Sequence, residues 1–391
     1  MSKLQNLINE LCPNGVEYIK IKDYFKRLKG TPITAGKMKE IENHNGEVKV
    51  FAGGKTVINA YEKDIPNANI IKVPAVLVQS RGIIDVIYYE KPFTFKNEMW
   101  AYTFENKITV KYLYYILKNN VQKFRDVASG MGSMPQISLS VTEDFKIPLP
   151  PLPIQEEIVR ILDNFTELTT ELTTELTARK KQYEYYRDKL LTFGEEVETK
   201  PLKLICDVRD GTHDSPKKSN DGKYLVTSKN IKNGVVDFNN CYKISEKDYH
   251  EINKRSKVDK YDLLFTMIGT IGEVALVENE PDYAIKNIGL IKTNNILLSK
   301  YLKYLLNSNY TKKYIDNNKS KGSQSFLALG KLRDMPIPLP PLAEQQRIVS
   351  ILDRFDALCN DITSGLPAEI ELRKKQYEYY RDKILDFKEL Q

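Results

Sequence analysis

The sequence lacks the features on which membrane, secreted and zinc proteins depend. In its 391 residues no apolar run approaches the roughly 18 to 20 residues that span a bilayer, and the first residues carry acidic and amide side chains where a signal peptide needs an apolar segment. The four cysteines are isolated, and the three histidines form no H-E-x-x-H motif. We therefore expect a soluble, cytoplasmic protein with buried or unreactive thiols and no metal of its own.

Signatures of nucleotide-binding and methyl-transferring enzymes are missing as well. There is neither a G-x-x-x-x-G-K-[ST] loop for phosphates nor an Asp/Asn-Pro-Pro-aromatic methyltransferase tetrad. Acidic residues are scattered, and the proline-rich strings at 148–153 and 338–341 carry no polar neighbour, so rigid junctions explain them better than a catalytic loop. We predict that the chain is not an enzyme, has no catalytic residues and binds no cofactor itself.

Positive charge is in slight excess and is carried mostly by lysine. The 59 Lys plus Arg exceed the 52 Asp plus Glu by 7, which permits a phosphate-rich partner without identifying one. Only 13 of these cations are Arg, the residue whose planar fork matches base edges. The positions of the few arginines therefore matter more than the net charge.

The strongest signal is an internal repeat. Residues 147–165, IPLPPLPIQEEIVRILDNF, return at 337–355 as IPLPPLAEQQRIVSILDRF, and RKKQYEYYRDK occurs unchanged at 179–189 and 373–383. The chain is thus two tandem halves, about 1–193 and 194–391.

Each repeated block is expected to form a long helix. Apolar residues from Ile154 to Leu172 follow a 4-3-4-3-4 spacing, which makes a narrow stripe of the coiled-coil type. Three TELT units at 166–177 continue the stripe as a stutter, whereas Gly365 and Pro367 should kink or interrupt the second helix. We expect the two stripes to cover each other as an antiparallel pair; the alternative is that each packs on its own globular half.

The stretches between the helices combine short β-rich runs with one helical run. The fold class is therefore α+β: two mixed α/β domains separated by two long helices that form an antiparallel coiled coil, in a pseudo-twofold tandem repeat. The predicted order is an N-terminal helix (1–14), a first globular domain (15–150), a central spacer helix (151–193), a second globular domain (194–340) and a C-terminal spacer helix (341–391). Strands are expected at 48–51, 75–79, 83–88, 93–95, 224–226, 235–238, 263–267, 274–277 and 288–292, and helices at 110–124 and 298–310.

Nucleic-acid binding is the function that suits the globular halves best. Residues 200–260 hold 14 Lys plus Arg against 9 Asp plus Glu, although a solvated surface would show a similar excess. Arg81 and Arg255 lie in polar loops and are the best candidates for contacts to bases. Glycine, hydroxyl and amide groups near them would let the backbone approach a phosphate or a groove closely. Ordinary turns use the same residue types, so this pattern alone is a weak signal. The predicted DNA-binding residues are Lys55, Gln79, Ser80, Arg81, His213, Lys217, Lys218, Ser228, Lys229, Asn230, Arg255 and Lys257.

These motifs together resemble one family, the specificity (S) subunits of type I restriction-modification systems. The resemblance covers nearly the whole chain and rests on the doubled IPLPPL-x-x-Q-x-x-I-V-x-I-L-D-x-F junction and the TELT repeats, which look like spacer repeats. It also rests on VLVQSRG at 76–82, DGTH-x-x-P from Asp210, TSKNI-x-x-G at 227–234 and DLLFT-x-x-G-x-x-G at 262–272.

The resemblance implies a non-catalytic subunit that reads DNA. Two target-recognition domains would each bind one half of a split, asymmetric site in double-stranded DNA, with the helices setting the spacer. Two methyltransferase (M) subunits would dock around the helices, carry S-adenosylmethionine and methylate adenine N6, and restriction (R) subunits would supply ATP- and Mg-dependent translocation. A scaffold that clamps partner subunits without reading DNA is the rival function, and a methyltransferase acting alone is a weaker third.

Overall fold

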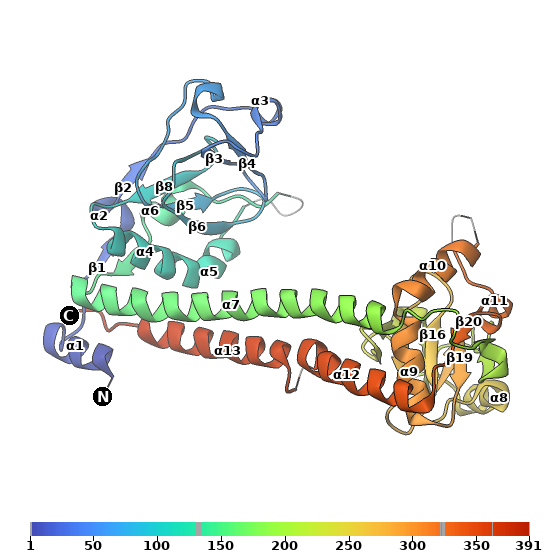
Figure 1. Cartoon of the computed structure of the whole chain (residues 1–391). Coiled ribbons are helices and arrows are strands. Elements are labelled where there is room, and N and C mark those ends of the chain that lie inside the picture. Colours follow the sequence, from blue (N-terminus) through green and yellow to red (C-terminus); the bar gives the residue numbers. More distant parts are fainter. Residues whose placement is uncertain (1, 130–133, 321, 323–324, 362, 391) are drawn as a thin grey trace. The chain divides into compact units, whose positions relative to one another are not determined.

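The computed structural model describes residues 2–129, 134–320, 322, 325–361 and 363–390, and it divides into two compact units. Unit 1 comprises Met1–Glu171 and Ile370–Gln391, and unit 2 comprises Leu172–Glu369. Helix α7 (Leu152–Leu190) carries the chain from unit 1 into unit 2, and α13 (Leu366–Ile384) carries it back (Figure 1). Each unit thus combines one globular domain with part of two long helices.

The globular domain of unit 1 alternates short strands and helices. Its elements are, in chain order, α1 (Lys3–Leu11), β1 (Tyr18–Lys20), α2 (Ile21–Tyr24), β2 (Lys26–Leu28), α3 (Ala35–Ile41), β3 (Val48–Phe51), β4 (Val57–Ala60), η1 (Glu62–Asp64), β5 (Ala75–Gln79), β6 (Asp85–Tyr89), β7 (Phe93–Phe95), β8 (Trp100–Thr103), α4 (Lys107–Asn119), α5 (Val121–Asp126), α6 (Leu139–Glu143) and β9 (Lys146–Pro148).

Unit 2 contains the corresponding strands with a different set of short helices and an additional hairpin. Its elements are β10 (Thr199–Pro201), η2 (Leu202–Leu204), β11 (Asp207–Asp210), β12 (Lys223–Thr227), η3 (Ser228–Asn230), β13 (Ile231–Lys232), β14 (Val235–Val236), β15 (Tyr242–Ile244), α8 (Glu246–Ser256), β16 (Leu263–Thr266), β17 (Val274–Leu276), β18 (Tyr283–Lys286), β19 (Ile288–Lys292), α9 (Ile296–Leu306), α10 (Asn309–Asn318), α11 (Leu329–Arg333), β20 (Pro336–Pro338) and α12 (Leu342–Asn360).

The two domains share one sheet topology. Unit 1 has an antiparallel sheet of order β2-β8-β5-β6 and a second sheet of order β4-β3-β7, in which β3 and β7 are parallel. Unit 2 repeats both as β11-β19-β16-β17 and β15-β12-β18, with β12 and β18 parallel. The β13–β14 hairpin of unit 2 and α3 of unit 1 have no counterpart among the described elements of the other unit, and α8 takes the place of the short η1. The predicted pair of mixed α/β domains is therefore confirmed.

One glycine in each domain is required by the same close approach between strands. A Cβ on Gly30 would lie 2.0 Å from the carbonyl oxygen of Phe95 at the end of β7, and a Cβ on Gly211 would lie 2.4 Å from that of Ile285 in β18. Backbone is packed against backbone at both places, so no side chain can give way. The loops that follow these glycines are consequently held at the same edge of the fold in both domains.

The predicted helical runs proved to be helix pairs. The run 110–124 is α4 followed by α5, and 298–310 is α9 followed by the start of α10. Asn120 and Ser308 take non-helical backbone angles and begin the second helix of each pair. Short polar side chains of this kind favour helix ends, which periodicity of apolar residues does not report.

The first turns of α7 belong to the core of the first domain. Ile154, Ile158 and Leu162 are fully buried in one cluster with Leu113 and Ile116 of α4. Burial of such side chains contributes roughly 1.5 to 3 kcal/mol each. Ile348 and Leu352 of α12 occupy the same place against α9 in unit 2. Part of each stripe therefore packs on its own globular half, as in the alternative interpretation.

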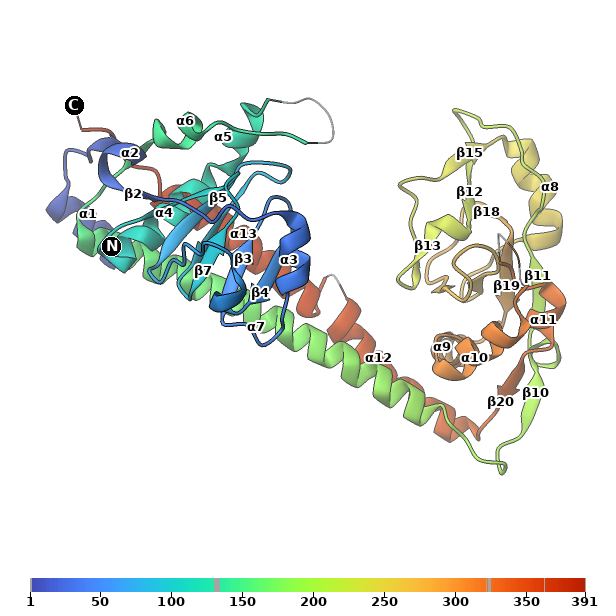
Figure 2. The same ribbon diagram turned by 90° about the horizontal axis from the view of Figure 1, so that it is seen from above.

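The rest of each stripe pairs with the opposite helix. In unit 1 the ring of Phe165 stacks on that of Tyr380, with 5.8 Å between the ring centroids. In unit 2 the ring of Tyr186 stacks on that of Phe355, with 5.7 Å between the centroids. Figures 1 and 2 both show α7 beside α13 and beside α12, with opposite chain directions. The expected antiparallel pairing is thus found within each unit.

Proline-containing segments connect each globular domain to its helix. The hydroxyl of Tyr112 donates to the carbonyl of Pro148, and Tyr301 donates to Pro338 in the same way. Between α12 and α13, the predicted break is present: Gly365 is buried, and a Cβ there would lie 2.4 Å from the carbonyl oxygen of Ala357. No helix in the described part of the chain is both long enough and apolar enough to cross a membrane.

Candidate nucleic-acid interface

In unit 1 the predicted residues Lys55 and Arg81 border one hollow. Lys55 lies in the turn between β3 and β4, Arg81 directly follows β5, and both side chains are exposed. The hollow measures about 750 Å³; Lys39 and Lys96 also line it, together with Glu42 and Glu98, and Lys96 pairs with Glu98 at 3.1 Å. Residues 26 positions apart in the sequence therefore present their cations to one concave surface, which suits a phosphate backbone.

Gln79 and Ser80 lie beneath the surface and hold the loops that form this hollow. Both are buried, and the amide of Gln79 donates to the carbonyl of Gly54 over 2.9 Å. The hydroxyl of Ser80 donates to the carbonyl of Glu98. These bonds tie the β3–β4 turn and the β7–β8 turn to the end of β5. The two side chains thus position the loops that carry Lys55 and Arg81.

In unit 2 the predicted residues His213 and Arg255 meet at one buried carboxylate. His213 Nε2 lies 2.9 Å from Asp210 Oδ2, and the guanidinium of Arg255 donates to Asp210 Oδ1. The side chain of Asp210 is 7% exposed, whereas those of His213 and Arg255 are 64% and 63% exposed. A charge-assisted bond to a fixed carboxylate orients an exposed guanidinium without covering it.

The turn between β18 and β19 joins this cluster. His213 Nδ1 lies 2.8 Å from Asn287 Oδ1, and the amide N–H of Asn287 donates to the carbonyl of Thr212 over 3.1 Å. Ser228 completes the contact because its hydroxyl donates to the carbonyl of Asn287 over 3.3 Å. Three of the predicted residues, His213, Ser228 and Arg255, are thereby brought together.

The remaining predicted residues of unit 2 lie around this cluster or within the fold. Asn230 is buried, where its side chain forms a capping box with Thr227 and holds the η3 turn. Lys257 pairs with Asp259 at 3.1 Å, and the Lys218 ammonium lies 5.7 Å from the ring centroid of Tyr242. The side chains of Lys217 and Lys229 are exposed.

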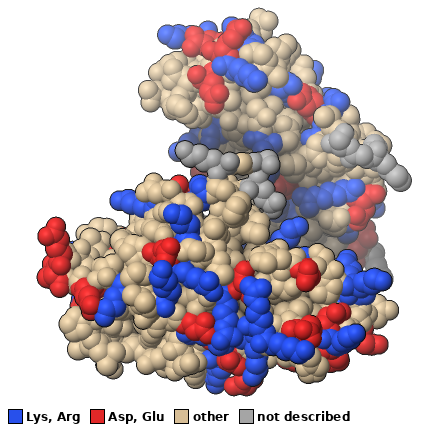
Figure 3. Space-filling model, turned by 90° about the vertical axis from the view of Figure 1, so that its right-hand side faces the viewer, with Lys and Arg blue, Asp and Glu red and all other residues tan. Residues whose placement is uncertain are grey.

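Acidic side chains neutralise part of the surface charge. Figure 3 shows Lys and Arg side chains gathered over one face with Asp and Glu between them. In unit 2, Lys292 lies between Asp259 and Asp262, at 2.8 and 2.7 Å, and burial raises the pKa of the Asp262 carboxyl. The excess of positive charge in residues 200–260 is therefore not all available to a phosphate backbone.

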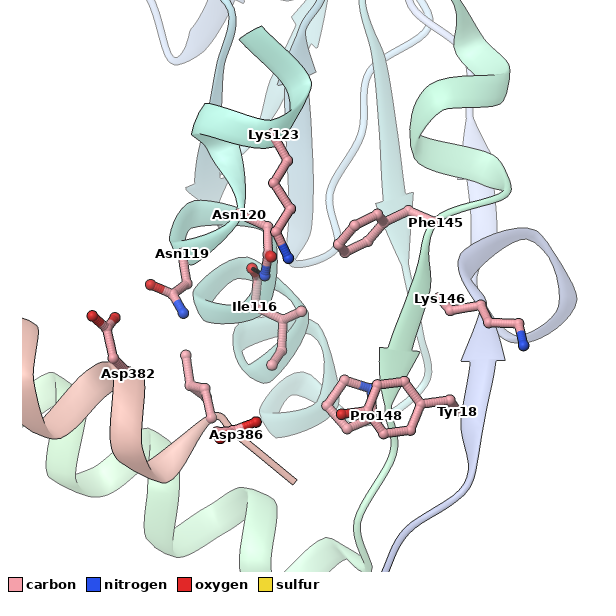
Figure 4. A pocket seen from close by; sticks show the side chains of 11 residues that line it. Tyr18, Ile116, Asn119, Asn120, Lys123, Phe145, Lys146, Pro148, Asp382 and Asp386 are labelled. Carbon is pink, nitrogen blue, oxygen red and sulfur yellow. Dashed lines mark hydrogen bonds between the residues drawn. The ribbon is translucent and has the colours of Figure 1, made fainter. Parts of the chain in front are cut away.

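A second hollow, of about 300 Å³, is a poor candidate for this interface. It lies in unit 1 between the end of α4 and the last residues of α13, and Figure 4 shows the carboxylates of Asp382 and Asp386 together with Lys123 and Lys146 around it. The two carboxylates would repel a phosphate, and the positive charge of the two lysines only balances their negative charge.

Sequence reasoning did not select several residues that shape the interface. Lys39 and Lys96 come from segments remote from Lys55, so only the fold brings them to the same hollow. Asp210 opens the DGTH segment, but no local pattern indicates that its carboxylate is buried and bonded to Arg255, 45 residues away in the sequence. Asn287 takes a φ of +55° in a two-strand turn, a conformation in which Asn is enriched. The enrichment of Asn at positive φ is the sequence signal that could have indicated this turn.

Comparison with known proteins gives the following similarities. The family described as Type I restriction modification DNA specificity domain matches residues 13–180 and 194–372. A type I restriction enzyme specificity subunit of Escherichia coli is 34% identical over 357 residues, which cover 87% of each chain. A putative subunit of the same type from Haemophilus influenzae is 33% identical over 318 residues, 75% of this chain and 77% of its own.

Solved structures share the fold. The S subunit of the type I restriction-modification system of M. genitalium matches with a TM-score of 0.57 at 16% identity, covering 95% of both chains. A chain from a structure titled as the complex assembly and conformational transition of the type I R-M system matches with a TM-score of 0.54 at 14% identity, over 95% of this chain and 98% of its own.

Proposed function

Because the chain belongs to the family of type I restriction-modification DNA specificity subunits, we propose that its two target-recognition domains each bind one half of a split, asymmetric site in double-stranded DNA. One observation carries the proposal: the domains share a topology but differ at equivalent loops. Gly53-Gly54-Lys55 lies after β3 where Ser228-Lys229-Asn230 lies after β12, and Arg81 after β5 corresponds to Ile268 after β16. One scaffold with two sets of loop side chains suits two different sequences.

Arginine is proposed to read bases in both domains. Arg81 would contact the first half-site from the hollow of unit 1, and Arg255 would contact the second. The guanidinium of Arg255 donates one hydrogen bond to Asp210, and its other N–H groups stay available for the O6 and N7 acceptors of guanine. His213 and Ser228 lie beside Arg255 and are proposed to contact the same half-site.

The remaining predicted residues fall into two groups. Buried Gln79, Ser80 and Asn230 are proposed to position the loops. The exposed lysines are proposed to contact phosphates, which adds affinity without sequence preference; they are Lys55, Lys217, Lys218, Lys229 and Lys257.

The long helices are proposed to dock two methyltransferase subunits. The segment RKKQYEYYRDK is identical in both halves, and its exposed members include Tyr185 and Tyr379, at 60% and 62% exposure. Exposed residues do not have to be identical for the core to pack. Identical exposed residues are expected if two copies of one partner bind the two segments. S-adenosylmethionine, ATP and Mg would reside on the methyltransferase and restriction subunits, in the cytoplasm.

Binding by the assembled complex tests the proposal. The chain would be co-purified with its methyltransferase subunits and used to select from random duplex DNA. We expect enrichment of a bipartite motif whose two parts differ and are separated by a fixed spacer. Stable association with the methyltransferase but no enriched motif would refute DNA reading and favour the scaffold function.

A further inference from the structure

The same three-residue contact joins α4 to α7 in unit 1 and α9 to α12 in unit 2. In unit 1 the hydroxyl of Tyr115 donates to Asp163 Oδ1 over 2.5 Å, and the ammonium of Lys111 donates to Asp163 Oδ2 over 2.7 Å. In unit 2, Tyr304 and Lys300 contact Asp353 with the same distances, 2.5 and 2.7 Å. The donors are four residues apart in each case, so they project from one face of one helix.

The phenol of each contact is buried, whereas its carboxylate is partly exposed. Tyr115 is 3% exposed and Tyr304 is 1% exposed, and the side chains of Asp163 and Asp353 are each 34% exposed. Burial raises the pKa of both phenols well above the ordinary value, and the hydrogen bond to the carboxylate adds to that rise. The two hydroxyls therefore remain protonated donors at any physiological pH.

The geometry fixes register as well as proximity. Apolar contacts between α4 and α7 are non-directional, so they would tolerate sliding or rotation of one helix on the other. Two donors one helical turn apart, bonded to the two oxygens of a single carboxylate, tolerate neither movement without losing a charge-assisted bond. Leaving the buried phenol without an acceptor would add a desolvation cost.

We propose that Lys111–Tyr115–Asp163 and Lys300–Tyr304–Asp353 are two register locks, each of which fixes the orientation of one recognition domain on its own long helix and so sets the spacer that the protein accepts. These are positioning residues and do not touch DNA. The inference rests on the proposed function, since a spacer exists only if both domains read DNA.

The test measures spacer preference in the chain assembled with its methyltransferase subunits. Tyr115→Phe and Tyr304→Phe remove only the hydroxyl, and binding would be measured on duplexes with the native spacer and with one base pair more or fewer. We expect the preference for the native spacer to fall about tenfold in Tyr115→Phe, the equivalent of about 1.4 kcal/mol, and by a smaller factor in Tyr304→Phe. The preference for both half-site sequences should stay unchanged.

Tyr314→Phe is the matched control. Its hydroxyl donates to the carbonyl of Lys331 over 2.9 Å, a bond confined to the globular domain of unit 2. Because that bond is exposed, this variant should lose less thermal stability than Tyr304→Phe, and it should keep the wild-type spacer preference. If Tyr304→Phe instead weakens binding to all spacers alike, with the preference intact, the side chains are only structural and the inference is wrong. If the wild-type complex shows no sequence preference, the proposed function fails first.

The locks are not equally strong. In unit 2 a second ion pair, Lys303 with Asp356 at 2.9 Å, lies one turn along the same two helices. The corresponding residues in unit 1 are Tyr114 and Thr166, which cannot form an ion pair. Tyr115→Phe should therefore relax the spacer preference more than Tyr304→Phe, and Lys303→Met combined with Tyr304→Phe should remove the difference.

Discussion

His213 and Arg255 hold the two oxygens of one buried carboxylate, that of Asp210, in the second recognition domain. The arrangement orders an exposed guanidinium, which would lower the entropic cost of the base contact proposed for Arg255. It also joins a loop after β11 to the end of α8, a helix in whose place the first domain has only the short η1.

Replacing Arg255 with alanine should relax the sequence preference in one half-site only. A bidentate contact from arginine to guanine contributes about 1 to 3 kcal/mol of discrimination, so preference at one position should fall about 5- to 150-fold. Motif determination from methylated DNA would measure this. Arg81→Ala is the matched variant and should relax the other half-site. Loss of preference in both half-sites from either substitution would contradict separate reading.

Replacing exposed lysines should weaken binding without changing sequence preference. Lys55→Gln and Lys229→Gln should each lower the slope of log affinity against log salt by about 0.9, the value for one phosphate contact. Lys203→Gln is the control, because Lys203 is paired with Asp334 at 2.7 Å. An altered motif with an unchanged salt slope would show that these lysines contact bases instead.

Deleting one TELT unit should shorten the spacer between the half-sites. Four residues correspond to about 6 Å of helix, against about 3.4 Å per base pair. We expect the unread spacer to shorten by one or two base pairs, with both half-sites unchanged, as determined by sequencing methylated bases. The second helix lacks TELT, so it need not measure distance equally, and an unchanged spacer would refute the role of α7 as a ruler.

Acid should destabilise unit 1 partly through Glu157. Its side chain is 4% exposed, and hydrogen bonds from Arg160 and Lys3 lower its pKa from 4.5 to about 2. A lowered pKa stabilises the fold above pH 4.5, and this stabilisation is lost as pH falls toward 2. Because Arg160 and Lys3 are largely exposed and screened by solvent, we expect Glu157→Gln to cost about 1 to 2 kcal/mol at neutral pH.

Thermal unfolding between pH 7 and pH 2 would measure that contribution. The wild type should lose stability more steeply than Glu157→Gln below pH 4.5, and the two curves should converge. Glu156→Gln, at an exposed neighbouring position, should follow the wild type. Parallel curves for the wild type and Glu157→Gln would show that this carboxylate does not contribute.

The fold was largely predictable because it is repeated. Periodic apolar residues predicted α7, and Gly365 with Pro367 predicted the break before α13. Strands β3, β5, β7 and β19 lie at the expected residues, since short β-branched runs bounded by Gly and Pro carry a local signal. Helix ends at Asn120 and Ser308 were missed because capping depends on single polar side chains.

The sequence alone determined the two-domain repeat, the helices that join its halves and the family, because periodicity, turn residues and repeated motifs are local properties of the chain. Only the tertiary structure decided which polar residues act together. Lys55 faces Arg81 across one hollow, Asp210 orients Arg255, and Tyr115 meets Asp163 because strands and helices distant in the sequence pack against each other. From the sequence, Gln79 and Asn230 are expected to be exposed hydrogen-bond donors, but in the structure both side chains are buried. Contacts of this kind depend on packing, which no local pattern encodes.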